Sequence, residues 1–537
     1  MIIYDAGVVT LLVPPIDASD ALPTSRRQLH IGRYPVVLPN ARDPRIHLSL
    51  VTITIFVIGI GWLGFRLSVA QILAAALTCG SIEIAVTMWR KSMIIWPASA
   101  LQTASSTALL LRVEGASSHD LWSMRGWYYF AGISAFGLLT KHVIRTGRGH
   151  VFNPSNIALA LAFLVFGSRR IEPLDFWWGP LRTPMVLAYA VIFVGGLFIC
   201  RRLRLIAMGV AFWITLAAGM AVLAVLDHSI TARWSLGPVQ GAHFWWVVLT
   251  SPEILIFLFF MLTDPRTVPA GRVARIVFGV LVAGLGSLLM APWQTEFGVK
   301  VGLLVSLAIV CASRPLLERH LPLAGTPEDD PRKWLAALLG VRLRRFTAAA
   351  AIVGLAAAVG VAGIRAQAAD QPPPPTDSIG AVDPSSLPTV SVDPQVAGLS
   401  AHLASPAGAQ ELAATLAFNL EVEQEALRTR DASLLTAVDH GDRLGELQKM
   451  IAAVGPGDPI VVPTYEFHTL HVIVVFPGGA QRGPNAGLVA TATETDITYS
   501  ADGREVSRDE RPVALTFAMR RTTSNHWQNT TTLPSPN

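Results

Sequence analysis

The run Ser251-Pro-Glu-Ile-Leu-Ile-Phe-Leu-Phe-Phe-Met-Leu-Thr-Asp-Pro265 is apolar, but it has a proline near its start and ends in Thr-Asp-Pro. A second interrupted run, Ile94-Ile-Trp-Pro-Ala-Ser-Ala-Leu-Gln-Thr-Ala-Ser-Ser-Thr107, occurs earlier in the chain. Irregular backbone at membrane depth is tolerated only where protein or a water-filled cavity satisfies its polar groups. The two runs therefore indicate a polar site between membrane helices. The alternative is that both prolines simply begin helices, where proline is favoured.

The rest of the chain is apolar enough to surround such a site with further membrane helices. Apolar residues make up 52% of the 537 residues and charged residues 15%, against about 25% charged in soluble domains. This composition excludes an ordinary soluble enzyme and a disordered protein. A helix needs about 20 apolar residues to cross a bilayer. Ten segments approach this length, near 47–65, 68–88, 94–112, 127–145, 153–167, 183–200, 204–226, 244–263, 276–291 and 299–313, and 346–364 is an eleventh.

The charges predict the orientation of these segments. After residue 369 there are 10 Lys and Arg against 20 Asp and Glu, so the preceding part carries the whole positive excess of the chain. That basic part is also the apolar part, so its cations are expected to flank membrane helices on the cytoplasmic side and not to bind nucleic acid. We expect a bacterial inner-membrane protein with a cytoplasmic arm over 1–46, a membrane domain over 47–320 and a basic cytoplasmic loop over 321–345. The eleventh segment would then place a Pro-rich linker (365–399) and a domain over 400–537 outside the cytoplasm.

The two interrupted segments are five segments apart and would run in opposite directions. Two inverted five-helix repeats produce this arrangement, with a ligand site at the interface of the repeats. The predicted fold class is therefore a mainly α integral membrane protein of about ten helices in two inverted repeats. It also has one further span and a small α+β extracytoplasmic domain.

Candidate site residues concentrate in the loop Lys141-His-Val-Ile-Arg-Thr-Gly-Arg-Gly-His-Val-Phe-Asn-Pro-Ser-Asn156. Asn is a good N-cap and Pro a good first helical residue, so a helix should begin at Asn153-Pro154. Free backbone N–H groups beside basic side chains form an anion site, suited to a phosphate, a flavin edge or a lipid head group. The alternative is an ordinary capped cytoplasmic loop. The predicted ligand-binding residues of this loop are Lys141, Arg145, Arg148, Asn153 and Asn156.

Thr263 and Asp264 complete the predicted site. They end the second interrupted segment, and a carboxylate at that depth is costly unless it is paired. Asp264 is expected to pair with a basic residue of the 141–156 loop or to orient a ligand. Glu83 is a further candidate inside a predicted helix. The three cysteines lie in apolar runs and are expected to be buried core residues, and no residue pattern predicts a metal site.

These motifs resemble the NqrB/RnfD family of membrane proteins. The resemblance covers residues 45–320 and rests on Gly149-His-Val-Phe-Asn-Pro154 and Phe260-Met-Leu-Thr-Asp-Pro265, which occur in the family's order. It implies ten helices in two inverted repeats, electron transfer and a flavin. Family members carry FMN covalently on a threonine of Ser-Gly-Ala-Thr, a sequence that this chain lacks; its nearest equivalent is Asp227-His-Ser-Ile-Thr231. The resemblance therefore allows only non-covalent FMN or riboflavin, and no catalytic residue is assigned.

The C-terminal region follows a different pattern. Apolar residues recur at helical spacing over 407–453, and strand-like runs follow at 460–462, 464–476, 487–499 and 512–521, with Asp502-Gly503 as a hairpin turn. Helices leading into a curved antiparallel sheet resemble the NTF2-like folds, in particular the Tim44-like modules. That resemblance implies a module that binds protein partners, with an enzyme as the alternative.

Three functions follow from these expectations. The first is a membrane component of a redox or ion-translocating assembly, with flavin bound non-covalently. The second is a small-solute transporter or channel without a redox cofactor. The third is an accessory protein that recruits a partner through its C-terminal domain. The partners expected in all three are membrane lipids and other proteins.

Overall fold

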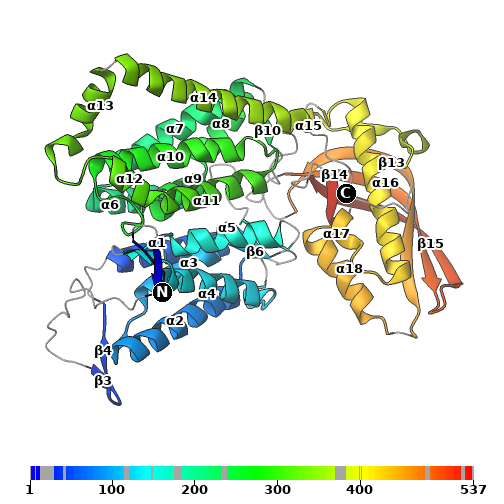
Figure 1. Ribbon diagram of the computed structural model, residues 1–537. Helices are drawn as coiled ribbons and strands as arrows, with labels where there is room; N and C mark the ends of the chain where they lie inside the picture. Colours follow the sequence, from blue (N-terminus) through cyan, green and yellow to red (C-terminus); the bar gives the residue numbers. More distant parts are fainter. Residues whose placement is uncertain are drawn as a thin grey trace.

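The computed structural model shows a helical part and a strand-rich C-terminal domain (Figure 1). It describes residues 2–5, 8–11, 29–39, 44–113, 120–146, 149–167, 170–173, 183–226, 228–230, 239–340, 342–368, 382–397, 399–400, 402–455, 457–477, 484–521 and 527–534. The chain is therefore mainly α with an added α+β domain, as the sequence predicts.

Eleven α-helices and one π-helix make up the described part of the helical domain, defined here as residues 44–312. The α-helices are α1 (Pro44–Gly61), α2 (Val69–Lys91), α3 (Ala98–Leu110), α4 (Trp127–Val143), α5 (Pro154–Phe166), α6 (Thr183–Leu203), α7 (Ile206–Val225), α8 (Gly241–Thr250), α9 (Pro252–Ile256), α10 (Arg272–Met290) and α11 (Glu296–Ala312), and the π-helix is η2 (Phe257–Met261). Within the described residues, five stretches are long and apolar enough to cross a membrane: α2, α6, α7, α10 and the α8–α9–η2 run. The bent pair of α11 and α12 (Arg314–His320) would be a sixth. Ten spans stay a prediction.

In both segments the proline begins a helix, as the alternative explanation predicts, and only the second segment has helix on both sides of its proline. In the first, Ile94–Ile95 (β5) is extended, and α3 begins directly after Pro97. In the second, α8 ends at Thr250, Ser251 caps α9 by accepting from the N–H of Ile254, and η2 follows. π-Helical turns are uncommon and often occur at functional sites.

Short strand pairs close the loops of the helical domain. β6 (Leu111–Val113) pairs with β9 (Ile171–Pro173) where α3 and α5 end, and β7 (Arg145–Thr146) pairs with β8 (Gly149–His150) before α5 begins. β10 (Ser229–Ile230) pairs with β11 (Val239–Gln240) before α8. We call the side where α5 begins the Asn153 end, and the side with the β6–β9 pair the Arg112 end.

The N-terminal arm and the segment after α11 also contain regular structure. In the arm, β1 (Ile2–Asp5) pairs with β2 (Val8–Leu11), and β3 (Leu29–Ile31), β4 (Tyr34–Val37) and β5 form one small sheet. The predicted basic loop over 321–345 contains η3 (Pro327–Asp329) and α13 (Pro331–Gly340). The eleventh predicted span, 346–364, lies inside α14 (Arg342–Ala368). The helix extends beyond the predicted span at both ends.

The C-terminal domain packs three helices on a five-stranded sheet. The main helices are α16 (Pro406–Thr429), α17 (Leu435–Val438) and α18 (Gly441–Ala453), preceded by η4 (Pro384–Ser386) and α15 (Pro394–Ala397). The sheet has the order β12 (Val390–Val392), β13 (Ile460–Val475), β14 (Asn485–Tyr499), β15 (Glu505–Arg521) and β16 (Trp527–Pro534). Its strands are antiparallel except at the β12–β13 pair. The turn at Asp502-Gly503 joins β14 to β15, as predicted.

Candidate functional site

A cavity lies between the two interrupted segments at the Asn153 end. About 310 Å³ of it is open to the centre of a water-sized sphere, enough for more than one ordered water. Its wall combines the polar face of α3, the beginning of α5 and the end of η2 with the residues that follow it. The lining residues are Leu48, Ser99, Gln102, Thr103, Ser106, His150, Asn153, Pro154, Ser155, Ile199, Leu203, Phe259, Phe260, Thr263, Asp264, Pro265 and Arg266. We call this space the Asn153 cavity.

Asn153 joins α5 to the second interrupted segment. Its Oδ1 accepts from the backbone N–H of Asn156 at 3.2 Å, the N-cap contact that its sequence position predicts. The amide Nδ2 of the same side chain donates to the carbonyl of Met261, the last residue of η2, at 3.2 Å. Satisfying a π-helical carbonyl in this way holds the end of η2 against the start of α5.

Asn156 is also buried, but it does not line the cavity. Its Nδ2 donates to the carbonyl of Leu304 on α11 at 2.9 Å, which ties α5 to α11. Its Oδ1 has no hydrogen-bond partner among the described residues. Asn156 therefore positions the helix that carries Asn153.

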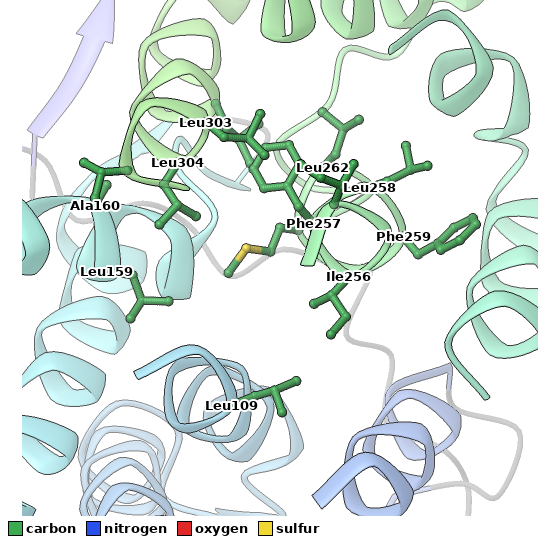
Figure 2. Packing of buried hydrophobic residues seen from close by; sticks show 14 of the residues in the cluster. Leu109, Leu159, Ala160, Ile256, Phe257, Leu258, Phe259, Leu262, Leu303 and Leu304 are labelled. Carbon is green, nitrogen blue, oxygen red and sulfur yellow. The ribbon is translucent and has the colours of Figure 1, made fainter. Parts of the chain in front are cut away.

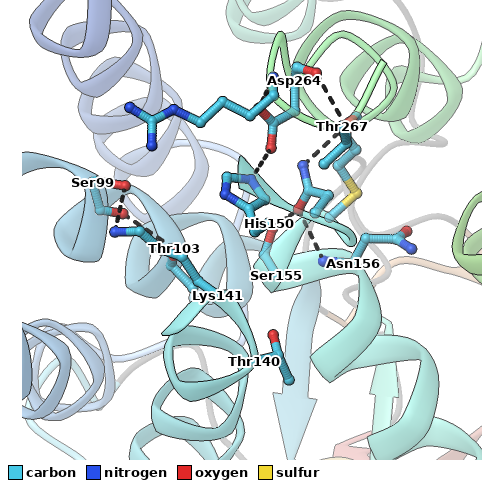
Figure 3. Close-up of polar contacts among 12 residues, drawn as sticks. Ser99, Thr103, Thr140, Lys141, His150, Ser155, Asn156, Asp264 and Thr267 are labelled. Carbon is cyan, nitrogen blue, oxygen red and sulfur yellow. Dashed lines mark hydrogen bonds and ion pairs between the residues drawn. The ribbon is translucent and has the colours of Figure 1, made fainter. Parts of the chain in front are cut away.

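Thr263 and Asp264 line the cavity just after η2. The Thr263 hydroxyl donates to the carbonyl of Phe259 at 2.5 Å. Asp264 Oδ2 lies 3.0 Å from His150 Nε2, and Oδ1 accepts from the N–H of Arg266 at 3.0 Å. Figure 3 shows the His150 ring turned toward the Asp264 carboxylate. Burial by itself would raise the pKa of the Asp264 carboxyl, but these contacts with His150 and Arg266 outweigh it and lower the pKa below its usual value.

Lys141 and Arg145 were predicted to bind the ligand, but neither of them lines the cavity. Lys141 Nζ lies 3.1 Å from Glu83 Oε1 and donates to Ser99 Oγ at 3.1 Å, so Lys141 contacts the cavity wall through Ser99 and does not face the cavity. His142 Nε2 lies 2.8 Å from Glu83 Oε2. Arg145 lies in β7, opposite His150 in the strand register, and does not line the cavity. Arg148 lies outside the described residues.

Two residues of the site were missed in the sequence analysis. His150 lies inside the quoted loop, but its role as the partner of Asp264 depends on tertiary contact. Arg314 is 3% exposed; it donates to the carbonyl of Arg266 at 2.5 Å and to Thr146 Oγ1 at 2.8 Å. It thereby joins the loop that follows η2 to the β7–β8 pair. In the sequence, Arg314 directly follows the tenth apolar segment, and this position predicted only how that segment is oriented in the membrane.

A smaller cavity lies toward the Arg112 end, on the other side of the same broken helices. About 70 Å³ is open to the centre of a water-sized sphere, and the wall is largely apolar except for Ser251, Glu253, Glu296 and Lys300. Lys300 Nζ is 3.1 Å from Glu253 Oε1 and 2.5 Å from Glu296 Oε1. We call this space the Glu253 cavity. Beyond it, a buried ion pair joins Arg112 on β6 to Glu172 on β9.

A packed apolar region borders the Glu253 cavity, with Phe257 and Leu304 in the wall of that cavity. Figure 2 shows side chains from α3, α5, α9, η2 and α11 converging there; those labelled include Leu109, Leu159, Ile256, Phe257 and Leu304. All five belong to one buried cluster.

The remaining sequence predictions concern cysteine and metal. Cys79, Cys200 and Cys311 are buried and unbonded, as expected. Within the part of the chain that the structure describes, no group of three or more His, Cys, Asp or Glu residues could hold a metal ion. The chain matches no family model and no curated protein.

Proposed function

We propose that this protein is a membrane component of a redox or ion-translocating assembly, and that the Asn153 cavity binds a planar ligand of the flavin class without a covalent bond. The observation that carries the proposal is the composition of the cavity wall. Phe259 and Phe260 supply aromatic surface, and Gln102, Thr103 and Ser106 supply hydrogen-bonding groups opposite the Asp264 carboxylate. Ligand sites typically combine apolar walls with a few placed polar groups in this way.

The residues present suit FMN or riboflavin. The side chains of Gln102 and Thr103 can donate to and accept from the polar edge of a flavin ring, and the phenylalanines can contact its apolar edge. Arg266 is exposed at the wall of the cavity, where a guanidinium would favour the phosphate of FMN. A bound flavin would supply the electron-transfer chemistry, while the protein positions it and sets its electrostatic surroundings.

The packing of the helices supports the inverted-repeat fold that we propose for the membrane domain. In the first half, α2 packs on α3 and α4, and α4 packs on α5. In the second half, α7 packs on α8 and α10, and α10 packs on α11. α1 contacts α6, and α5 contacts α11, which are the corresponding helices of the two halves. A ten-helix arrangement of two inverted repeats accounts for all of these pairings.

Ligand binding can be tested with the purified full-length protein. We expect visible flavin absorbance, or saturable quenching of riboflavin or FMN fluorescence, at about one flavin per chain. Asp264→Asn should weaken binding at least several-fold, because it removes the charge that holds His150 in the cavity wall. Asp120→Asn is the matched control, because Asp120 is exposed and its carboxylate accepts from the N–H of Trp122, away from the cavity wall. Absence of binding to the unmodified protein would refute the flavin proposal.

A transporter without a redox cofactor is the second candidate. It is favoured by the two cavities on opposite sides of η2, each bordered by an interrupted segment. Alternating access between such cavities is how many transporters with inverted repeats work. A flavin-free sample that moves solute across liposomes, and loses this activity in Lys300→Met, would favour this candidate over the first.

A further inference from the structure

The predicted basic loop over 321–345 contains an amphipathic helix, α13. Its large apolar side chains lie three or four positions apart and therefore share one side of the helix: Trp334, Leu335, Leu338 and Leu339. Leu335 and Leu339 are 50% and 44% exposed, and none of the ten residues of α13 is buried. A single exposed leucine is ordinary, but an apolar face along a whole helix indicates a surface that binds a partner or a membrane.

The start of α13 is fixed at the Asn153 end of the helical domain. Asp329, in η3 just before α13, is 5% exposed, and its Oδ1 accepts from the backbone N–H of Val273 at 3.0 Å. Val273 belongs to the first turn of α10, which begins shortly after Arg266 of the Asn153 cavity wall. This contact therefore holds α13 on the side of the molecule where the Asn153 cavity lies.

The direction of α13 differs from that of the helix that follows it. Figure 1 shows α13 at the end of the helical domain that lies away from the C-terminal domain, turned away from the direction of α14. α14 packs on α7 and α10 and contains the eleventh predicted span. If that span crosses the membrane, α13 lies where it enters the bilayer.

The charges of this region are almost all positive. The cations of α13 and the first turn of α14 are Arg332, Lys333, Arg342, Arg344 and Arg345, and the sequence has no Asp or Glu from residue 331 to residue 369. Both cations of α13 itself are exposed. Of the acids just before α13, Asp329 is used by α10, and Asp330 accepts from the N–H of Arg332 at 2.9 Å as a cap. Glu328 is exposed to solvent.

An apolar face beside a group of cations matches the surface of a bilayer that contains anionic lipids. Helices with Trp and Leu on one face and Lys or Arg on the other lie in the plane of the membrane interface. Tryptophan is favoured at the level of the lipid head groups, and each cation close to an anionic surface adds to the attraction. A basic helix next to a predicted span therefore favours lipid over a protein partner.

We propose that α13 lies in the membrane interface at the Asn153 end, with its apolar face among the lipid acyl chains and its cations against anionic lipid head groups. The helix thereby anchors the start of α14 to the membrane surface. This inference depends on the helical domain being in a membrane, but not on which ligand the Asn153 cavity binds.

Spin labels on the full-length protein in lipid vesicles test where the face of α13 lies. Labels are placed at Leu335→Cys and, as the matched control, at Ala337→Cys; both side chains are exposed, and the native cysteines are buried. Ala337 lies about 200° around the helix from Leu335, on the other side. Collisions with oxygen report the acyl region of the bilayer, and collisions with a water-soluble nickel complex report the aqueous phase.

We expect the Leu335→Cys label to be protected by anionic lipid. In vesicles of an equal mixture of phosphatidylcholine and phosphatidylglycerol, it should be at least several-fold less accessible to the nickel complex than the Ala337→Cys label, and more accessible to oxygen. In phosphatidylcholine alone the difference should shrink, because the attraction between the cations and the lipid is lost.

Substitutions of the cations test the recognition of charge. Arg332→Gln with Lys333→Gln, in the Leu335→Cys protein, should make the nickel accessibility nearly the same in the two kinds of vesicle. Lys449→Gln with Arg504→Gln is the matched control, because both cations are exposed on the C-terminal domain and should leave the lipid dependence unchanged.

Three results would overturn the proposal. The first is equal nickel accessibility of the Leu335→Cys and Ala337→Cys labels in both kinds of vesicle, which would place the apolar face in water. The second is protection that does not depend on phosphatidylglycerol. The third is low accessibility of the Leu335→Cys label to both reagents, which would show that a protein surface, such as a second copy of the chain, covers the face. These comparisons use single exposed positions, so they stand even if the variant without Arg332 and Lys333 fails to fold.

Discussion

His150 and Asp264 lie 114 residues apart in the chain, and their side chains meet with Nε2 and Oδ2 3.0 Å apart. His150 is in the loop that precedes α5, and Asp264 follows η2, so this contact connects two of the parts of the chain that line the Asn153 cavity. The contact joins Asp264, a charged residue of the cavity wall, to the 141–156 loop that the sequence predicted as part of the site.

We expect His150 and Asp264 to be energetically coupled. Side chains in direct contact within one network typically show coupling energies of about 0.5–3 kcal/mol. Unfolding of His150→Gln, Asp264→Asn and the double variant should therefore be non-additive by an amount in this range. Additive effects of the two single changes would show that the contact contributes nothing to stability.

The Asp264 contact should also give a pH dependence. The pKa of this carboxyl is lower in the folded protein than its usual value near 3.9, so the folded state binds its proton less tightly than the unfolded chain does. Asp264 therefore stabilises the fold at pH values above about 4, and this contribution is lost as the pH falls through the folded-state pKa. The stability difference between the unmodified protein and Asp264→Asn should be constant near neutral pH and shrink below about pH 4. A constant difference down to pH 3 would contradict this.

The cluster around Glu83 should be important for stability. Glu83 contacts both Lys141 and His142, and the side chains of Glu83 and Lys141 are 14% and 12% exposed. Glu83→Gln removes the carboxylate charge that faces Lys141; breaking a fully buried pair in this way typically costs about 3–5 kcal/mol, and this pair is partly buried. We expect a loss near the lower end, measured by thermal unfolding in detergent. Arg504→Ala, which removes an ion pair whose arginine is 86% exposed, should have no measurable effect.

Two glycines of α4 provide a matched test of helix packing. A Cβ on Gly137 would lie 2.6 Å from the carbonyl oxygen of Pro154, whereas a Cβ on Gly132 would meet nothing within 4 Å. Gly137→Ala should push α4 away from the start of α5, at a cost of about 1–3 kcal/mol, and weaken ligand binding in the Asn153 cavity. Gly132→Ala should leave binding unchanged and should not lower stability, because Ala is favoured over Gly inside a helix. Equal behaviour of the two variants would refute the close approach of α4 and α5.

The buried carboxyl of Asp439 should destabilise the C-terminal domain at neutral pH. Because its pKa is raised in the folded state, the folded protein keeps a proton that the unfolded chain releases above about pH 4, and stability falls as the pH rises from there. Asp439→Asn should raise the melting temperature by a few degrees at pH 7, with no gain below about pH 4. Glu423→Gln should lower it, because Glu423 pairs with Arg443 and accepts from Asn529. The hydrogen-exchange rates of β16 peptides, measured on the full chain, would report the effect of both substitutions on the stability of the C-terminal domain.

The sequence by itself determined the local features of this protein. The prolines and polar residues of the interrupted segments placed the breaks before α3 and within the α8–α9–η2 run, and Asn153-Pro154 placed the start of α5. The strand-like runs placed β13, β14 and the second half of β15, whereas β15 begins at Glu505, earlier than predicted. These features depend on neighbours in the chain, and local backbone preferences are readable from residue types.

The tertiary structure alone decided which side chains meet. The sequence offered several basic residues as partners for Asp264, but the packing of the helices gives it His150, while Lys141 is used by Glu83. It also decided that Arg314 joins the loops at the Asn153 end and that Arg66 meets His440, 374 residues further along the chain. Such contacts depend on how helices distant in sequence are rotated and spaced against each other, and the helical pattern of a single segment contains no information about its partner.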